Sequence, residues 1–255
     1  MTTTDTAPDL VARHYEPLVA AARARFTESA VVGAVTAGTG DRARMDRFLI
    51  WYCALGTQMT APVEGWIARA GRRCVELGWE ELGAALVRHA AHEAGHDALM
   101  ASDTRALVTR WNRDERAALD AAALLAAPPT EGITQYIDLH EQTIAGTAPY
   151  AQIAIEYEIE RLSVTVGPQV MATVAAVCGA DRVALLTFLD HHIELDAGHT
   201  VFNRHQLARL LGDHPDAAPT LAAAGSAALD AYLQFLTDCW IAAAGTGPPS
   251  VGGRT

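Results

Sequence analysis

The 255-residue chain contains no lysine, and arginine supplies all 19 of its basic residues. Without lysine the chain cannot form a Schiff base with pyridoxal phosphate or with a carbonyl substrate. A phosphate-binding loop of the Walker type is also excluded, because that loop requires a lysine. No glycine-rich fingerprint takes its place. These absences exclude enzymes that form a lysine Schiff base and enzymes that bind nucleotides with a Walker-type loop.

Cysteines and long apolar runs are also scarce. The four cysteines are too far apart for a zinc knuckle or a CxxC redox pair, so we expect free buried thiols at Cys53, Cys74, Cys178 and Cys239. Charged residues interrupt the apolar runs, which predicts no transmembrane helix. The net charge is −11 and no basic stripe indicates nucleic acid. Because Met1–Pro8 lacks a signal-peptide core, we expect a cytoplasmic protein. Because no polybasic or strongly apolar segment is present, we expect it to bind neither nucleic acid nor a membrane.

Half of the residues are hydrophobic, and alanine and leucine dominate, which predicts an all-α fold. We expect one helical domain over residues 9–244, between a flexible N-terminus (1–8) and a disordered tail (245–255). One long helix is predicted from Trp79 to about Trp111, with Gly83 and Gly95 as weak points. Residues 33–40 are predicted to be a loop, and Gly167-Pro168 is a candidate kink in a later helix.

The most informative motif is His192-x3-Asp196-x2-His199. On an α-helix these positions share one face, so two imidazoles and one carboxylate project in the same direction. Mixed nitrogen and oxygen ligands suit iron, manganese or zinc better than calcium or magnesium. The motif therefore predicts half of a metal site, with Asp190 as a candidate hydrogen-bond acceptor behind an imidazole.

Two further segments carry candidate ligands. Glu93 and His96 have the Glu-x-x-His spacing used in carboxylate-bridged di-iron bundles. Glu156 and Glu160 share a helix face and repel each other unless a cation or a proton lies between them, so either is a candidate ligand. Glu158 points elsewhere, and we expect its replacement to be nearly silent.

Four other residues have weaker signals. Glu64 lies near the start of a helix, where an acidic residue is also explained by the helix dipole. His89 lies one turn before Glu93, and Arg88 and Arg161 are candidate binders of a substrate carboxylate. For each of these three, a surface or supporting position is the alternative.

Together these residues resemble the heme-oxygenase-like non-heme di-iron oxidases and oxygenases. That family carries a Glu, then a Glu with a nearby His, then a Glu, then His-x3-Asp-x2-His, on separate core helices. The matching residues are Glu64, Glu93, His96, Glu160, His192, Asp196 and His199. The Tyr157–Glu160 stretch is similar to the family's aromatic-x-x-Glu turn, which favours Glu160 over Glu156. Arg161-Leu162-Ser163 replaces the family's glycine-rich turn and leaves the substrate class open.

The resemblance implies a bundle of about seven core helices that binds two Fe²⁺ ions and no heme. It implies an O2-dependent oxidoreductase that acts on a small amino-acid- or acid-derived metabolite by N-oxygenation, desaturation or oxidative C–C cleavage. An external electron donor and a homodimer are further expectations. The alternatives are a metal-free bundle of the thiamin-degrading or quinone-cofactor-forming type, a metal carrier without turnover, and a helical interaction module.

Overall fold

The computed structural model describes residues 9–38, 40–114 and 117–245. The predicted flexible N-terminus and residues 246–255 of the predicted tail lie outside these ranges. The described residues form helices and no strand, so the all-α prediction is confirmed. The elements are η1 (Val11–Tyr15), α1 (Glu16–Thr27), α2 (Ala30–Ala37), α3 (Arg42–Thr60), α4 (Val63–Glu76), α5 (Glu80–Ala90), α6 (His96–Asp114), α7 (Ala121–Leu125), α8 (Glu131–Ala145), η2 (Pro149–Ala151), α9 (Gln152–Thr165), α10 (Gly167–Val177), α11 (Ala180–Val183), α12 (Thr187–Asp213), η3 (Pro215–Ala217) and α13 (Ala218–Ala244).

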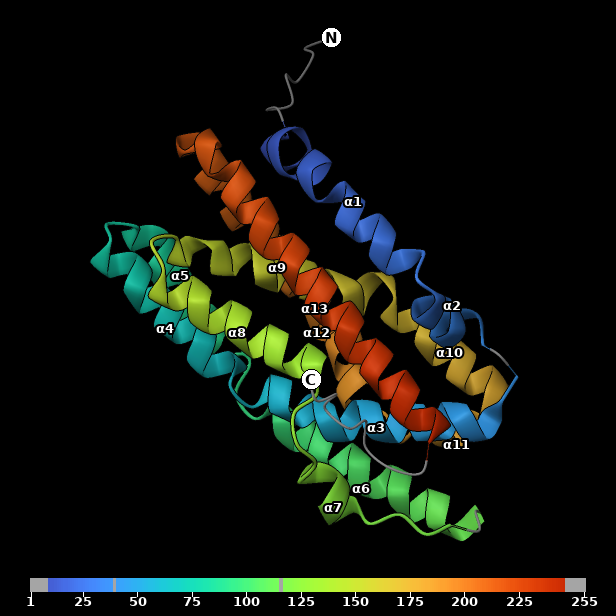
Figure 1. The fold of residues 1–255 in the computed structure, drawn as a ribbon. Helices are drawn as coiled ribbons and strands as arrows, with labels where there is room; N and C mark the ends of the chain where they lie inside the picture. Colours follow the sequence, from blue (N-terminus) through green and yellow to red (C-terminus); the bar gives the residue numbers. More distant parts are fainter. Residues whose placement is uncertain (1–8, 39, 115–116, 246–255) are drawn as a thin grey trace, which may run out of the picture.

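The last helix, α13, lies across the front of the bundle in the view of Figure 1 and packs against α1, α3, α8 and α9. Its alanine-rich surface permits this close packing. Where α13 crosses α8, a Cβ on Gly132 would lie 2.2 Å from the backbone nitrogen of Phe235. The missing side chain at Gly132 therefore allows the two backbones to meet.

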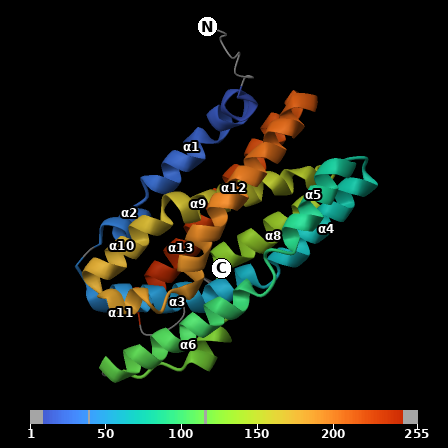
Figure 2. The same ribbon diagram turned by 180° about the vertical axis from the view of Figure 1, so that it is seen from behind.

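The helix with the His-x3-Asp-x2-His motif, α12, lies on the other side of the bundle. It packs along α9 and also contacts α5 and α6 (Figure 2). Its buried polar residues recur every three or four positions, from His192 to Gln206. This spacing directs one polar stripe of α12 into the interior, toward the three other helices.

The helix boundaries differ from the sequence prediction at three places. Residues 33–40 were predicted to be a loop, but α2 covers Ala30–Ala37, with Ser29 accepting a hydrogen bond from the Val32 amide as its N-cap. The predicted helix from Trp79 to Trp111 is broken between Ala90 and His96. The motif helix begins at Thr187 rather than near Asp181, because the short α11 and a turn precede it. The candidate kink at Gly167-Pro168 is present as the junction between α9 and α10.

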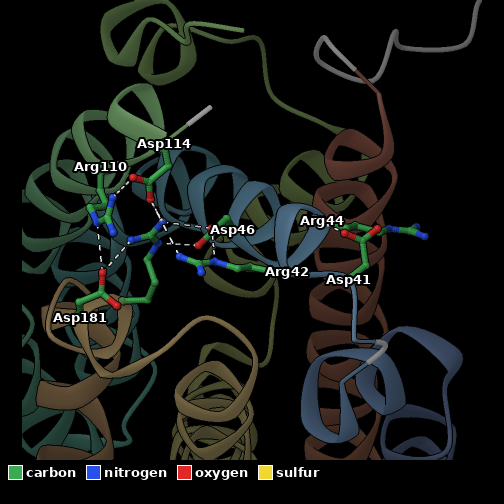
Figure 3. Close-up of polar contacts among 8 residues, drawn as sticks. Asp41, Arg42, Arg44, Asp46, Arg110, Asp114 and Asp181 are labelled. Atoms are coloured by element: carbon green, nitrogen blue, oxygen red, sulfur yellow. Dashed lines mark hydrogen bonds and ion pairs between the residues drawn. The ribbon is translucent and has the colours of Figure 1, made fainter. Parts of the chain in front are cut away.

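A buried arginine joins α11 to α3 and α6. Arg182 is only 2% exposed, and its guanidinium contacts Asp46 at 2.7 Å and Asp114 at 3.0 Å. Figure 3 shows these two aspartates with the flanking Arg42 and Arg110. Several carboxylates surround the arginine, so its charge is compensated inside the protein. This cluster anchors the turn that leads into α12.

Among the described residues, no helix is both long enough and apolar enough to cross a membrane.

Candidate metal centre

The three motif residues of α12 project from one face into the interior. His192, Asp196 and His199 are 8%, 2% and 6% exposed. His191 and Glu194, which lie off this face, are exposed. The Nδ1–H of His192 donates to the Phe188 carbonyl at 2.8 Å, which leaves its Nε2 atom directed into the protein. Asp190 was expected to orient an imidazole, but it is exposed, and a backbone carbonyl one turn before His192 takes this position instead.

Glu93 and His96 meet, although they do not share a helix. Glu93 lies in the turn between α5 and α6, and His96 is the first residue of α6. Gly95 has a φ of +82°, a conformation that glycine adopts without strain. The turn brings Glu93 Oε2 to 2.9 Å from His96 Nδ1. The predicted proximity is present, and its cause is a glycine turn instead of helical spacing.

Glu160, from α9, meets residues of two other helices. His89 of α5 donates from Nε2 to Glu160 Oε1 at 2.8 Å, and both side chains are buried. The Asn203 amide of α12 donates to the other oxygen, Glu160 Oε2. The Glu160 carboxylate is therefore held in one orientation beside the motif residues.

These side chains form two groups whose ligand atoms lie within 4.8 Å of one another. The first group contains Glu93, His96 and His192, and the second contains His89, Glu93, Glu160 and His199. Glu93 belongs to both groups: its Oε2 faces His96, and its Oε1 lies 3.3 Å from His199 Nδ1. A third group, His89, exposed His92 and His199, overlaps the second. A carboxylate shared by two groups is the arrangement that bridges two metal ions in carboxylate-rich helical bundles.

The polar atoms of the cluster fit a cation. His199 Nδ1 is buried and makes no hydrogen bond, yet carboxylate oxygens of Glu93, Glu160 and Asp196 lie 3.3–3.5 Å away. His192 Nε2 lies 3.1 Å from His96 Nδ1, so two imidazole nitrogens face each other. An orphaned imidazole nitrogen surrounded by carboxylates is costly in a buried site unless a cation occupies the space among them.

Burial and crowding of carboxylates shift the proton affinities of the cluster. Burial, together with the nearby Asp196 charge, raises the pKa of Glu160 well above its usual range. Burial also lowers the pKa of His192. Burial acts to raise the pKa of Glu93 too, but contacts with His96 and His199 outweigh it, so that pKa is lowered. Of these three groups, only Glu160 holds its proton more tightly than usual, and a cation bound beside it would displace that proton.

Glu156 lies one turn before Glu160 and belongs to a second polar network. Gln152 Nε2 donates to Glu156 Oε1 at 2.5 Å and to His140 Nδ1 at 2.8 Å. The His140 ring stacks on Trp66, with ring centroids 4.1 Å apart, and burial lowers the pKa of His140 to about 3. Burial and the Glu160 charge raise the pKa of Glu156 to about 8. Of the two candidate glutamates, only Glu160 belongs to the ligand groups.

A cavity of about 80 Å³ adjoins the cluster. We call it the site cavity. Its polar wall contains Glu93, Glu156, Glu160, His192 and Asp196, and much of its remaining wall is apolar or aromatic, including Met59, Met100, Phe188 and Phe235. Four carboxylates and the His192 imidazole thus face a small, largely apolar space.

Three residues predicted from the sequence lie away from the cluster. Glu64 is exposed in the first turn of α4, where its neighbour Val63 faces the site cavity instead. Arg88 is exposed on α5, next to the buried His89. Arg161 follows Glu160 and lines a different cavity. In each case the adjacent residue occupies the inward position, and consecutive residues of a helix point about 100° apart.

The structure also adds residues that the sequence argument did not select. Asn203 is fully buried and holds Glu160, and Gln152 holds Glu156. Asn203 follows His199 by four positions on the same helix face, so extending the motif by one turn would have found it. His89 was considered only as a substrate contact, whereas its ring lies among the ligand groups.

No protein-family model matches the sequence, and no curated protein matches it either. Solved structures show the fold. A domain of unknown function with a heme oxygenase-like fold from Shewanella denitrificans OS217 aligns with a TM-score of 0.67 and 17% identity, over 92% of this chain and 94% of its own. A TenA homolog from Pseudomonas syringae pv. tomato DC3000 aligns with a TM-score of 0.66 and 17% identity, over 94% of this chain and 99% of its own. The fold of the chain is therefore heme oxygenase-like, as the sequence resemblance implies.

Proposed function

We propose that the protein binds two iron ions at the α5–α6–α9–α12 cluster and is an O2-dependent oxidase or oxygenase of a small metabolite. One observation carries this proposal: Glu93 presents one oxygen to His96 and the other to His199, so it joins two groups of ligand atoms. Mixed imidazole and carboxylate ligands suit iron, and shared carboxylates favour a pair of ions.

Within this proposal the residues divide between the two ions. Glu93, His96 and His192 would hold the first ion, and Glu93, Glu160 and His199 the second. Asp196 faces the same space and supplies a further carboxylate, and His89 is a ligand or a partner of Glu160. Glu64 is left out, because its side chain is exposed.

The bound iron would supply the redox chemistry with O2, and the protein would supply position and environment. The Phe188 carbonyl accepts the His192 Nδ1–H, so Nε2 carries the lone pair and would be the atom that binds an ion. Asn203 holds Glu160 in place. The apolar wall of the site cavity limits water beside the reacting atoms and leaves room for a small substrate.

A paired substitution on α12 tests this proposal. Substituting His192→Ala removes a proposed ligand, whereas substituting His191→Ala removes its exposed neighbour. Co²⁺, which reports its ligands by visible absorbance, is titrated into the metal-free proteins. We expect tight binding in the wild type and in the His191 variant, and loss of one of two binding events in the His192 variant. Equal binding by both variants would reject the ligand assignment.

The TenA homolog among the structural neighbours favours one alternative, a metal-free enzyme that uses acid/base or thiol chemistry. Thiol chemistry has little support, because Cys53, Cys74, Cys178 and Cys239 are all buried and burial raises the pKa of each. None of them lines the site cavity. Acid/base chemistry would use the same glutamates. Enzyme activity that persists after complete removal of metal would identify a metal-free acid/base enzyme.

A further inference from the structure

Two more cavities lie near the site cavity and share lining residues in series with it. The first, about 60 Å³ in volume, we call the apolar chamber. Tyr52, Ser163 and Tyr232 line both the apolar chamber and the site cavity, so these residues form a shared wall. The two tyrosine hydroxyls lie 3.1 Å apart at this junction. Apart from these three residues, the chamber is lined only by hydrophobic side chains and Gly167.

The second, about 210 Å³ in volume, we call the mouth cavity. It shares Phe26, Leu162 and Val166 with the apolar chamber. The mouth cavity is polar where the chamber is not: threonine hydroxyls, the Gln169 amide and two arginines contribute to its wall. By their shared residues the three cavities lie in the order mouth cavity, apolar chamber and site cavity, and the last is lined by the carboxylates and the His192 imidazole.

The two arginines of the mouth differ in their partners. Arg23 is bound by Glu158 through two hydrogen bonds of 2.9 and 2.7 Å, so its charge is compensated. The guanidinium of Arg161 makes no hydrogen bond or ion pair with any residue that the structure describes, and it is partly exposed. An uncompensated guanidinium beside an apolar chamber is suited to bind the acid group of a molecule whose remainder is apolar.

We infer that the three cavities form one substrate passage, in which Arg161 binds an acid group and the apolar chamber takes a hydrocarbon portion that reaches toward the cluster. The acid group of the substrate would then lie at the end remote from the metal ions. The two inner cavities are small, comparable together with a cavity of about 150 Å³ that holds benzene in another protein. The substrate class is therefore a monoacid with a short apolar body. This inference rests on the proposed function only for what happens at the metal ions.

The test uses octanoate and octan-1-ol, which share a chain and differ in charge. Binding is measured by calorimetry with metal-free protein, so that no turnover is needed. We expect octanoate to bind about fivefold more tightly than octan-1-ol, the effect of one partly exposed charged contact. Arg161→Gln should remove this preference and leave octan-1-ol binding unchanged. Arg88→Gln, which changes an exposed arginine outside the cavities, is the matched control and should change neither affinity.

A second pair of variants tests the route. Val166 lines both the mouth cavity and the apolar chamber. Val166→Phe should therefore lower the affinity for both octanoate and octan-1-ol by about tenfold or more. Val201→Phe introduces the same side chain at an exposed position of α12 and should have no effect. Val170→Phe, a second substitution within the chamber wall, takes the place of Val166→Phe if that variant does not fold.

Three results would overturn this inference. One is unchanged binding of both ligands in the folded chamber variants. Another is loss of octanoate binding in Arg47→Gln but not in Arg161→Gln, which would place the acid in the separate cavity beside Trp51 and Trp111. The third is octanoate binding that requires Fe²⁺ and ignores Arg161, which would place the acid on the metal. Predicted octanoate binding without metal uptake would instead reject the proposed function and leave the passage intact.

Discussion

Three glutamates of α9 show how one residue position decides a side chain's task. Glu156 and Glu160 face the site cavity, whereas Glu158 points toward α1. There it accepts hydrogen bonds from the Tyr15 hydroxyl at 3.0 Å and from the Arg23 guanidinium. Helical spacing correctly predicted that Glu158 faces away from the cluster. It did not predict that Glu158 is completely buried, because residues of η1, α1 and α13 cover that side and the sequence gives no sign of these contacts.

Glu158→Ala should therefore destabilise the protein instead of being silent. The substitution leaves Tyr15 and Arg23 without their buried partner, and we expect a loss of about 3 kcal/mol in the free energy of unfolding. Urea denaturation measures this loss. Glu194→Ala, at an exposed position of α12, is the matched control and should change stability little. A Glu158→Ala protein as stable as the control would show that the ion pair contributes nothing.

Glu156 makes the stability of the metal-free protein depend on pH. Burial raises its pKa from 4.5 to about 8, so the folded protein keeps a proton that the unfolded chain releases. This contribution to stability is fully present below pH 4.5 and is lost as the pH rises toward 8. In Glu156→Gln, unfolding free energies at pH 5 and pH 8.5 should therefore differ less than in the wild type. Glu194→Gln is the control. An unchanged pH dependence in the Glu156 variant would contradict the assigned proton.

At the scale of helices, the start of α12 is held by α6. The N-cap residue of α12, Leu186, makes no side-chain hydrogen bond to the helix. Instead Asp103 of α6 accepts hydrogen bonds from the Phe188 amide at 2.9 Å and from the Thr187 hydroxyl at 2.5 Å. Because α6 begins with His96 and α12 carries His192, this cap fixes the relative position of two proposed ligands.

Asp103→Ala should lower both stability and metal affinity. Loss of a cap costs about 1–2 kcal/mol, and freeing the start of α12 should weaken Co²⁺ binding measured by titration. Asp103→Asn keeps an acceptor oxygen and should recover part of both. Asp120→Ala removes a comparable cap, on the Ala122 amide of α7, and should affect stability alone. If the Asp103 and Asp120 variants bind Co²⁺ equally well, the cap does not position the ligands.

The elements also show where sequence patterns reach their limit. The His-x3-Asp-x2-His spacing placed three side chains on one buried face, because a helix repeat is set by local geometry. The turn at Ala91–Gly95 was not predicted, because Ala91, Glu93 and Ala94 are all strong helix formers. Gly83 and Gly95 were both predicted weak points, but α5 continues through Gly83 and the helix breaks only before Gly95. The pairing of α5, α6, α9 and α12 depends on contacts between distant segments, which no local pattern contains.

At the scale of the whole molecule, composition predicted the all-α class, and the order of the ligand residues indicated the heme oxygenase-like fold. Structural neighbours of only 17% identity share that fold. Glu64 illustrates the difference between family pattern and position: the pattern includes it, but the start of α4 directs Val63 inward and leaves Glu64 exposed. Asn203 and the cavities could be located only after the helices were assembled.

We propose that the bundle holds two metal ions and that Glu93 is a ligand of both. An anaerobic Fe²⁺ titration of the metal-free protein, with bound iron counted by elemental analysis, tests this proposal most directly. We expect saturation at two ions per chain. We also expect that Glu93→Ala lowers affinity at both positions, because Glu93 faces both groups of ligand atoms. Absence of saturable iron binding by the wild type, or unchanged loading of two ions in Glu93→Ala, would contradict the proposal.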